Sequence, residues 1–333
     1  MTSGAFLPSA KLVTVFGGSG FLGRHVVRAL ARRGYRIRVA VRRPDLAGHL
    51  QPLGAVGQIM AVQANVRYRR SVMRAAEGSD IVINLVGILQ QVGRQSFGAV
   101  QQNGARLIAE AAAAVHARLI HISAIGADKT SSSIYARTKA LGEEATLAAV
   151  PDAIIFRPSI MFGQEDAFFN RFAALTRSLP ILPLVGGNTK FQPVFVGDVA
   201  EAIARAVDGE LAGGRVYELG GPEVCTLRSL VDYVQTITGH KRPVLSLPFG
   251  VARLQAAVIE VVDKLTFGLM PDALVITRDQ VKLLAIDNIV SENAISEGRT
   301  LEGIGIAPTS HQAVLPGYMW RFRKSGQFNE ARV

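Results

Sequence analysis

The chain has little cysteine and no long uninterrupted apolar run. One cysteine, Cys225, occurs among 333 residues, so no internal disulfide can form, and we expect a small buried thiol in a reducing compartment. No stretch of about 18 uncharged apolar residues is present, which predicts the absence of a membrane-spanning helix. The opening MTSGAFLPSA lacks the basic start and long apolar core of a signal peptide, so we expect none there.

Acidic residues are also few relative to basic ones. Aspartate and glutamate number 26 against 37 lysines and arginines, which gives a formal net charge of +11. Such an excess suits an anionic ligand, an acidic lipid surface or an acidic protein partner. The arginines are spread over several predicted elements without an aromatic stacking ladder or a nucleic-acid motif, so we expect no nucleic-acid partner. Six histidines occur without an HxH or HExxH spacing, and the sequence therefore predicts no metal site.

Apolar sequence, in contrast, is abundant and regularly arranged. Hydrophobic residues make up 49% of the chain and charged residues 19%, which is typical of a well-buried globular protein. In the first half, Val/Ile/Leu-rich segments alternate with helical patterns, as in parallel βαβ units buried on both faces. The predicted strands are 11–17, 36–41, 57–62, 80–87, 117–123 and 152–158, and the helices between them include 20–33, 97–115 and 132–149. We therefore predict an α/β fold with a Rossmann-type, doubly wound parallel sheet.

The alternation becomes irregular after about residue 158. Helices are predicted over 168–178, 198–208, 226–238, 248–285 and 309–322, and strands over 191–196 and 215–221. Thr226 is the predicted N-cap of helix 226–238, and Gly239 follows its end. We predict a Rossmann domain over 1–160 with returns from 191–220, and a smaller C-terminal α/β lobe over most of 161–333. The apolar segment 248–267 is either a core helix or a face that docks a membrane protein or lipid headgroups. Segment 179–187 is a second candidate for contact with an apolar partner or an isoprenoid tail.

A glycine-rich loop follows the first predicted strand. In TVFGGSGFLGRHVVRAL, Gly17 permits a tight turn, Gly20 lets the main chain approach a pyrophosphate, and Gly23 lets the helix pack close to its strand. The helix then presents free N–H groups and its positive dipole to the phosphates. Because the loop lies inside a βαβ pattern, it predicts a dinucleotide site.

The end of the second predicted strand indicates which dinucleotide is bound. An NAD-specific site places an acidic residue there to bind the ribose 2′-hydroxyl, whereas this chain reads VAVRRPD, with Arg42 and Arg43 in its place. Guanidinium groups pair with a 2′-phosphate, so we predict NADPH or NADP as the cofactor. The alternative is that one or both arginines face solvent, as we expect of Asp45.

Three motifs together resemble the short-chain dehydrogenase/reductase superfamily in its extended and atypical branches. They are the GxxGxxG loop, Tyr135-x-x-x-Lys139, and Arg157-Pro158 at the end of the sixth predicted strand. More narrowly, the chain resembles the dehydrogenase-like accessory subunit of respiratory complex I and its bacterial relatives. The similar stretches are VFGGSGFLGRHVV, DIVINLVG, SSSIYARTKALGE, IIFRPSIMFGQEDAFFNRFA, FQPVFVGDVAEAI and ITRDQVKLL.

The resemblance implies a tightly held NADPH of structural role, at the edge of the peripheral arm near the quinone site and the membrane surface. It also implies cofactor contacts along the whole cleft. These are Gly17, Gly18, Ser19, Gly20, Phe21, Leu22, Gly23, Arg42, Arg43, Asn65, Val66, Leu85, Val86, Gly87, Tyr135, Lys139, Pro158 and Ile160. A sister group of this family supports ubiquinone biosynthesis.

The catalytic machinery implied by the resemblance is incomplete. Tyr135 and Lys139 face one side of a helix, where the tyrosine would transfer a proton and the lysine would lower its pKa and bind the nicotinamide ribose. The third member, a hydroxyl after strand 117–123, is replaced by Ile125, and Ser123 lies two residues earlier on the same strand face. Losing such a donor costs about 3–4 kcal/mol of transition-state stabilisation. The serines at 131–133 are substitutes only if their loop folds toward the site.

Two functions follow from these observations. The first is an NADP(H)-binding protein associated with respiratory complex I, with a structural or regulatory cofactor, located in the cytoplasm and peripherally at the cytoplasmic face of a bacterial inner membrane. The alternative is an active NADP-dependent reductase or epimerase, for example in ubiquinone biosynthesis, which the Tyr135–Lys139 pair favours. A regulator that senses the NADPH/NADP ratio has no specific support in the sequence. The oligomeric state and any substrate are left open.

Overall fold

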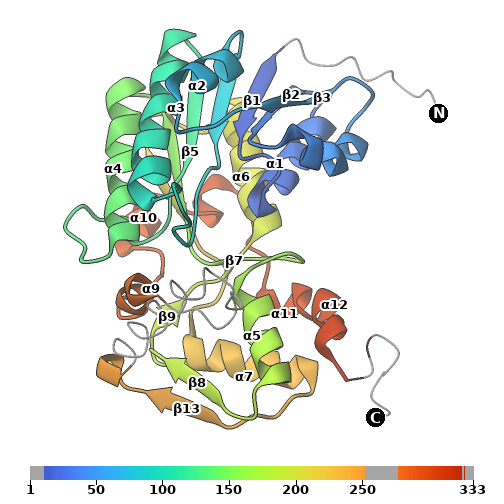
Figure 1. Cartoon of the computed structure of the whole chain (residues 1–333), viewed down its shortest axis with the longest axis vertical. Coiled ribbons are helices and arrows are strands. Elements are labelled where there is room, and N and C mark those ends of the chain that lie inside the picture. Colours follow the sequence, from blue (N-terminus) through green and yellow to red (C-terminus); the bar gives the residue numbers. More distant parts are fainter. Residues whose placement is uncertain (1–10, 252–276, 325, 327–333) are drawn as a thin grey trace. The chain divides into compact units, whose positions relative to one another are not determined.

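The computed structural model describes residues 11–251, 277–324 and 326, and the chain passes repeatedly between two compact units (Figure 1). The first unit contains the described residues up to Pro158, with Val196–Leu219 and Glu292–Ile306. The second contains Ser159–Phe195, the described parts of Gly220–Ser291 and those from Ala307 on. Within these described ranges, no helix combines the length and apolarity needed to cross a membrane.

The first unit is built on a seven-stranded sheet whose strand pairs are all parallel. In spatial order the strands are β11 (Val216–Leu219), β6 (Ile154–Pro158), β5 (Arg118–Ile122), β4 (Ile81–Asn84), β1 (Leu12–Phe16), β2 (Arg36–Val41) and β3 (Ile59–Gln63). The order reverses between β1 and β4, where a doubly wound sheet opens a crevice at its carboxyl ends. The predicted Rossmann-type fold is confirmed.

Helices cover both faces of this sheet (Figure 1). α2 (Arg69–Ala76), α3 (Asn103–Ala114) and α4 (Ile134–Ala149) pack side by side, and α1 (Phe21–Arg32) packs against α6 (Val196–Asp208). The inner strands are buried on both faces, which explains their near-continuous apolar sequence: on β4, the successive residues Val82 and Ile83 are both fully buried, whereas Met60 on the edge strand β3 is 56% exposed. Shorter elements complete the unit: η1 (Pro44–Leu53), η2 (Gly98–Gln102), α10 (Glu292–Ser296) and η3 (Glu302–Ile304).

The second unit combines short strand pairs with helices. The pairs are β7 (Met161–Phe162) with β10 (Val194–Phe195), β9 (Lys190–Phe191) with β12 (Cys225–Thr226), and β8 (Leu182–Val185) with β13 (Val244–Leu247). The helices are α5 (Phe168–Ser178), α7 (Leu227–Thr238), α9 (Arg278–Leu283), α11 (His311–Val314) and α12 (Pro316–Met319), followed by η4 (Trp320–Phe322). Most of their apolar side chains form a cluster around Phe162, Phe169 and Leu230, and Val185 of β8 and Val281 of α9 form a smaller one.

The boundaries of α7 follow from its sequence. The Thr226 hydroxyl accepts a hydrogen bond from the Ser229 N–H, and Gly239 ends the helix with φ +71°. Both predicted caps are confirmed. The single helix expected over 309–322 is instead α11, α12 and η4, because Pro316 begins a new helix.

The two apolar segments that sequence reasoning left open have different outcomes. Segment 179–187 contains strand β8, whose Leu182 and Leu184 are buried in the core of the second unit, so packing accounts for these two side chains. Ile181 of the same segment is 52% exposed, and the expected contact with an apolar partner or an isoprenoid tail stays a prediction. The predicted helix 248–285 and the segment 248–267 lie mostly outside the described residues, and α9 is the helix described near its end.

Candidate nucleotide-binding site

The loop after β1 makes a tight turn at Gly17. Its φ of +83° is a left-handed conformation that favours glycine. The Gly17 N–H donates to the Ala40 carbonyl (3.1 Å), and the Gly17 carbonyl accepts from the Gly20 N–H (3.1 Å). A Cβ at position 17 would lie 3.3 Å from the backbone of Leu85 and Val86 in the turn after β4. The loop is therefore held between β2 and that turn.

Helix α1 begins close against this loop. A Cβ at Gly23 would lie 2.5 Å from the Gly17 carbonyl oxygen, so the close approach predicted from the sequence is present. Gly20 is the N-cap without a side-chain bond, and the first turn carries no acidic residue. The first N–H groups of the helix have no intrahelical acceptor, and with the positive end of the helix dipole they suit a phosphate. The other predicted contacts of this segment are Gly18, Ser19, Phe21 and Leu22.

A buried amide, Asn84, fixes the turn after β4. Its Oδ1 accepts from the Val86 N–H (3.0 Å), and its Nδ2 donates to Nδ1 of His121 on β5 (3.0 Å). Burial, and to a smaller extent the charge of Lys139, lowers the pKa of His121 to about 3, so the ring is neutral and accepts at Nδ1. Sequence reasoning missed both residues, although a polar side chain inside the apolar stretch DIVINLVG was a usable signal.

The two arginines after β2 are both exposed but have different surroundings. Nη2 of Arg43 lies 2.8 Å from Oδ2 of Asp45, and this hydrogen-bonded ion pair holds the pKa of the Asp45 carboxyl below its usual value. Among the described residues, Arg42 forms no ion pair. Sequence reasoning missed the pairing of Arg43, although an Arg-x-Asp spacing indicates it. Arg42 is therefore the guanidinium available to an anion at this edge.

Tyr135 and Lys139 lie on the first turns of α4. The helix begins after Ser133, whose hydroxyl accepts from the Ala136 N–H (3.3 Å), so this serine is engaged as a cap. Lys139 is 6% exposed, and its Nζ donates to the Ile122 carbonyl (3.1 Å) at the end of β5.

Burial controls the protonation of both side chains. It raises the pKa of Tyr135 to about 12, so the phenol keeps its proton at neutral pH and can donate it. It lowers the pKa of Lys139 to about 8, against the opposing effect of Glu143. A Cβ at Gly87 would lie 3.5 Å from the Lys139 ammonium nitrogen, so the turn after β4 and the lysine are neighbours. The family resemblance predicts that this pair contacts a nicotinamide ribose.

The hydroxyl that should complete the reductase set is absent from its position. Ile125 is buried there, and its N–H donates to the Pro158 carbonyl (3.1 Å). Ser123, proposed from the sequence as the substitute, is 4% exposed; its Oγ is buried and has no hydrogen-bond partner among the described residues. The hydroxyl is thus enclosed in the described conformation, and a catalytic role for Ser123 stays a prediction.

Of the remaining predicted contacts, three belong to the first unit and one, Ile160, belongs to the second. Oδ1 of Asn65 accepts from the Arg67 N–H (3.2 Å), and Val66 packs against Gly104 of α3. Pro158 ends β6. Ile160 belongs to the second unit, where it packs beside the cluster that contains Phe162 and Phe169.

Gln101 stands where relatives in this superfamily often have an asparagine, and the resemblance implies that its amide can form similar hydrogen bonds. Gln101 donates to the Ile88 carbonyl (2.8 Å) and accepts from the Thr138 hydroxyl (2.8 Å), which ties the segment after β4 to α4.

The residues present fit a dinucleotide. The glycine cradle and the first turn of α1 accommodate a pyrophosphate, the end of β2 offers a cation, and Lys139 lies beside Gly87 for a ribose. All of these lie at the carboxyl ends of β1, β2, β4 and β5 or on the following elements, as expected for a doubly wound sheet. The described geometry supports binding more fully than it supports catalysis.

The second unit also brings together potential metal ligands. Glu223, Cys225 and His311 offer ligand atoms that lie within 4.8 Å of one another. The search for HxH and HExxH spacings could not find them, because their single histidine, His311, lies far along the chain from Glu223 and Cys225. Cys225, expected to be a buried hydrophobe, is only half-buried, and burial together with the Glu223 carboxylate raises the pKa of its thiol.

Lys139 makes the stability of the nucleotide-free protein depend on pH. Its pKa falls from 10.5 to about 8 on folding, so between these values the unfolded chain binds a proton that the folded chain does not. The free energy of unfolding should therefore rise by about 2 kcal/mol from pH 8 to pH 10 because of this residue. The raised pKa of Tyr135 begins to oppose this rise near pH 10, where the unfolded phenol loses its proton and the folded one keeps it.

Urea unfolding of Lys139→Met at several values between pH 8 and pH 10 tests this prediction. The rise should disappear in Lys139→Met and persist in Lys129→Met, which changes an exposed lysine paired with Glu144. An equal slope in the wild type and in Lys139→Met would show that folding does not lower the pKa of Lys139, and it would contradict the prediction.

Comparison with known proteins identifies the family. Residues 13–220 match the model of the NAD dependent epimerase/dehydratase family. The chain is 34% identical over 332 residues to "NADH dehydrogenase (ubiquinone) 1 alpha subcomplex subunit 9, mitochondrial" of Arabidopsis thaliana, covering 98% of this chain and 81% of that protein. It is 36% identical over 189 residues to a ceramide reductase of Caulobacter vibrioides, covering 57% of this chain and 58% of that protein.

A solved structure shows the same fold. The crystal structure of gox2253 matches 96% of this chain and 100% of its own length with a TM-score of 0.70 at 23% identity. The chain belongs to the NAD dependent epimerase/dehydratase family, and within it to the homologues of subunit 9 of the NADH dehydrogenase (ubiquinone) 1 alpha subcomplex.

Proposed function

We propose that this chain is an accessory subunit of a respiratory NADH:ubiquinone oxidoreductase and that it holds NADP(H) as a structural or regulatory group. The observation that carries the proposal is the 34% identity to such a subunit across 98% of the chain. Similarity restricted to the nucleotide-binding segment would support only a cofactor class. The likeness instead includes the segments that form the second unit.

The end of β2 supports NADP(H) rather than NAD(H). Arginines, and no acidic residue, stand at the two positions that directly follow this strand, where a carboxylate would bind a ribose 2′-hydroxyl and repel a 2′-phosphate. Arg42 is exposed and forms no ion pair with a described residue, so it can pair with a 2′-phosphate without first losing a partner. Arg43 can join only by exchanging its exposed contact with Asp45.

The incomplete catalytic set supports a structural or regulatory role for the nucleotide. The nucleotide supplies a hydride when it is bound, and a reductase must stabilise the substrate oxygen while it accepts that hydride. Here Tyr135 holds a proton and Lys139 lies where the ribose is expected, but an aliphatic side chain occupies the position of the third donor. The chain therefore keeps the groups that bind and lacks one that promotes turnover.

The charge distribution supports a peripheral location against an acidic surface. The net charge is +11, and Arg69, Arg70 and Arg74 are exposed on α2. Such a surface is attracted to anionic headgroups or to an acidic protein face. We place the protein at the cytoplasmic side of a bacterial inner membrane, next to the enzyme that it serves.

A second function has its own support. The Tyr135–Lys139 pair is in place, and a protein named ceramide reductase is 36% identical over 189 residues. An active NADP-dependent reductase or epimerase, for example acting on a quinone precursor, is the function that these observations favour.

Arg42→Ala tests the choice of nucleotide. Removing a charge-assisted contact costs about 1.5–3 kcal/mol, which corresponds to roughly a 10- to 100-fold weaker binding of NADPH. Binding of NADH, which lacks the 2′-phosphate, should be unchanged. Calorimetric titrations of both nucleotides measure these affinities. The control is Arg74→Ala, which removes an exposed arginine from another element. Equal losses for NADPH and NADH in Arg42→Ala would refute the assignment.

Turnover separates the two functions. The purified protein should retain NADPH and should not consume it in repeated cycles with carbonyl or quinone acceptors, whereas Ile125→Ser, which adds the missing hydroxyl, should increase slow oxidation by up to about 10²-fold. The absorbance of the reduced nicotinamide reports both. Multiple turnovers in the wild type that vanish in Tyr135→Phe would contradict the structural role and establish the reductase.

The association is tested by capture from membranes. The full chain, tagged and expressed at its natural level, should co-purify the hydrophilic subunits of NADH:ubiquinone oxidoreductase from detergent-solubilised membranes. The charged contacts predict that capture weakens as the salt concentration rises. Recovery of the protein only in the soluble fraction at low salt, without any of those subunits, would overturn the proposed association.

A further inference from the structure

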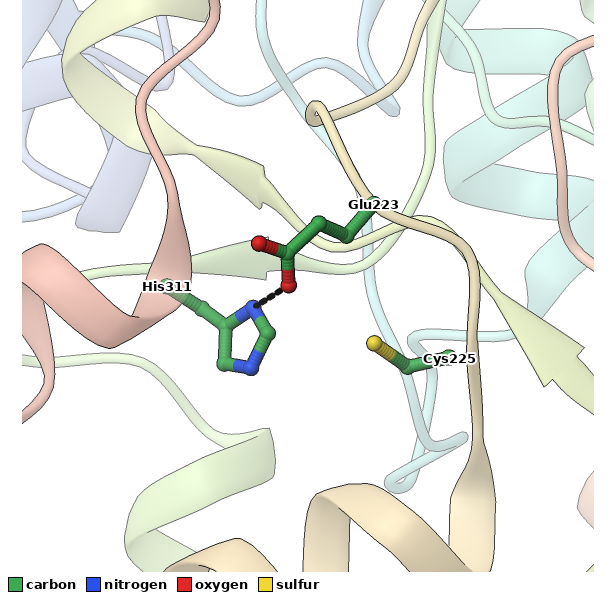
Figure 2. Close-up of side chains that lie close together, drawn as sticks. All are labelled: Glu223, Cys225 and His311. Atoms are coloured by element: carbon green, nitrogen blue, oxygen red, sulfur yellow. Dashed lines mark ion pairs between the residues drawn. The ribbon is translucent and has the colours of Figure 1, made fainter.

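Three side chains of the second unit converge on one point (Figure 2). Figure 2 shows Glu223 and Cys225 extending from one segment toward His311 at the start of α11, with the ion pair between Glu223 and His311 drawn as a dashed line. Oε2 of Glu223 lies 3.7 Å from Nδ1 of His311, and one ligand atom from each of the three residues lies within 4.8 Å of the others. The cluster shares no residue with the nucleotide loop.

Packing holds two of the three ligands in place. The His311 ring is 4% exposed; it stacks on Phe169 at 6.5 Å between ring centroids and 11° between planes, and it meets the edge of Tyr233 at 5.4 Å. Cys225 lies on β12, whose backbone pairs with β9 at Phe191. The imidazole and the thiol are therefore positioned before any ligand arrives, which reduces the entropy lost on binding.

Glu223 is the adjustable member. Its side chain is 42% exposed, and Gln312 on α11 donates to its Oε2 at 3.5 Å. In a tetrahedral zinc site, bond lengths of about 2.0–2.3 Å place neighbouring ligand atoms roughly 3.3–3.8 Å apart. Glu223 and His311 are already at this spacing, and the set as a whole, with all three ligand atoms within 4.8 Å of one another, needs only a small contraction.

We propose that Glu223, Cys225 and His311 form a binding site for Zn²⁺. The donor set selects the metal, because a thiolate and an imidazole suit zinc, whereas Mg²⁺ and Ca²⁺ prefer oxygen ligands alone. The half-buried Cys225 and the exposed Glu223 leave the fourth position open to water. Zinc would take the place of the direct contact between Glu223 and His311 and would cross-link α11 to β12.

The bound ion would act within the second unit. His311 begins the segment that continues into α12, and Cys225 directly precedes Thr226, the N-cap of α7. A metal bound to both residues ties these two helical segments together beyond their apolar packing. Because the metal binds the folded unit in preference to the unfolded chain, zinc should raise the unfolding temperature.

Metal titration of the full chain tests the proposal. Protein stripped with a chelator and kept reduced is titrated with Co²⁺ and then with Zn²⁺ in competition with a chromophoric chelator. We expect one equivalent bound, an intense tetrahedral cobalt spectrum with a thiolate-to-cobalt charge-transfer band, and displacement of Co²⁺ by Zn²⁺ but not by Mg²⁺.

Variants identify the ligands. Cys225→Ser should abolish the charge-transfer band. Both Cys225→Ser and Glu223→Gln should weaken zinc binding by at least about tenfold, because even mutating a residue that only supports a ligand typically lowers metal affinity by about 10–100-fold. Glu223 is partly exposed, so its variant should fold even where changes at the packed His311 do not. His49→Gln, at an exposed histidine of the first unit, is the control and should bind zinc as the wild type does.

Two results would overturn the site. One is the absence of a thiolate-to-cobalt band in the reduced wild type, and the other is zinc binding that is unchanged in both Cys225→Ser and Glu223→Gln. Because the readouts are spectra and affinities for the metal alone, they are independent of nucleotide binding and of any association with a respiratory enzyme.

Discussion

The close approach of the first turn of α1 to the loop after β1 is the constraint on which the rest of the site depends. A single added carbon at Gly23 would lie 2.5 Å from the Gly17 carbonyl oxygen, so this approach exists only because position 23 lacks a side chain, while the φ of +83° at Gly17 favours glycine separately. This packing places the first N–H groups of α1, which have no intrahelical acceptor, at the carboxyl ends of the strands where the strand order reverses. The family relationship has a physical basis in this contact, because it creates the phosphate site.

Around that contact the protein keeps a buried polar framework. Asn84 and His121 bridge β4 and β5, and Lys139 reaches the end of β5 from α4. Burial disfavours charge on both His121 and Lys139, which reduces the stability of the isolated protein. Such a cost is understandable where a ligand completes the site, because a bound nucleotide stabilises the state that holds these groups in position. In this view the nucleotide contributes to folding whether or not it reacts.

The sequence predicts the first unit well because its signals are local. Each long strand is a continuous apolar run, the glycine spacing marks one turn, and caps such as Thr226 lie within a few residues of the bonds that they make. The two-residue strands β7, β9, β10 and β12 carry too few residues for a periodicity, so sequence reasoning merged or missed them. The pairing of Arg43 with Asp45 was accessible from spacing and was overlooked.

Tertiary relationships account for what the sequence could not supply. Nothing in the neighbourhood of Asn84 indicates His121 as its partner, and nothing near Cys225 indicates His311, because each pair meets only when separate segments fold together. Ile125, in contrast, could be singled out from the sequence alone. Its position relative to a family pattern raised the question of catalysis, and its burial in the structure agrees with a site built to hold a nucleotide.

Electron density for the protein purified without added nucleotide is the most direct test of this account. We predict NADPH in the crevice, with its pyrophosphate against the loop of Gly17 and Gly20 and its 2′-phosphate within hydrogen-bond distance of Arg42. A crevice that stays empty even after soaking with NADPH, or an adenosine ribose that lies away from Arg42, would contradict it.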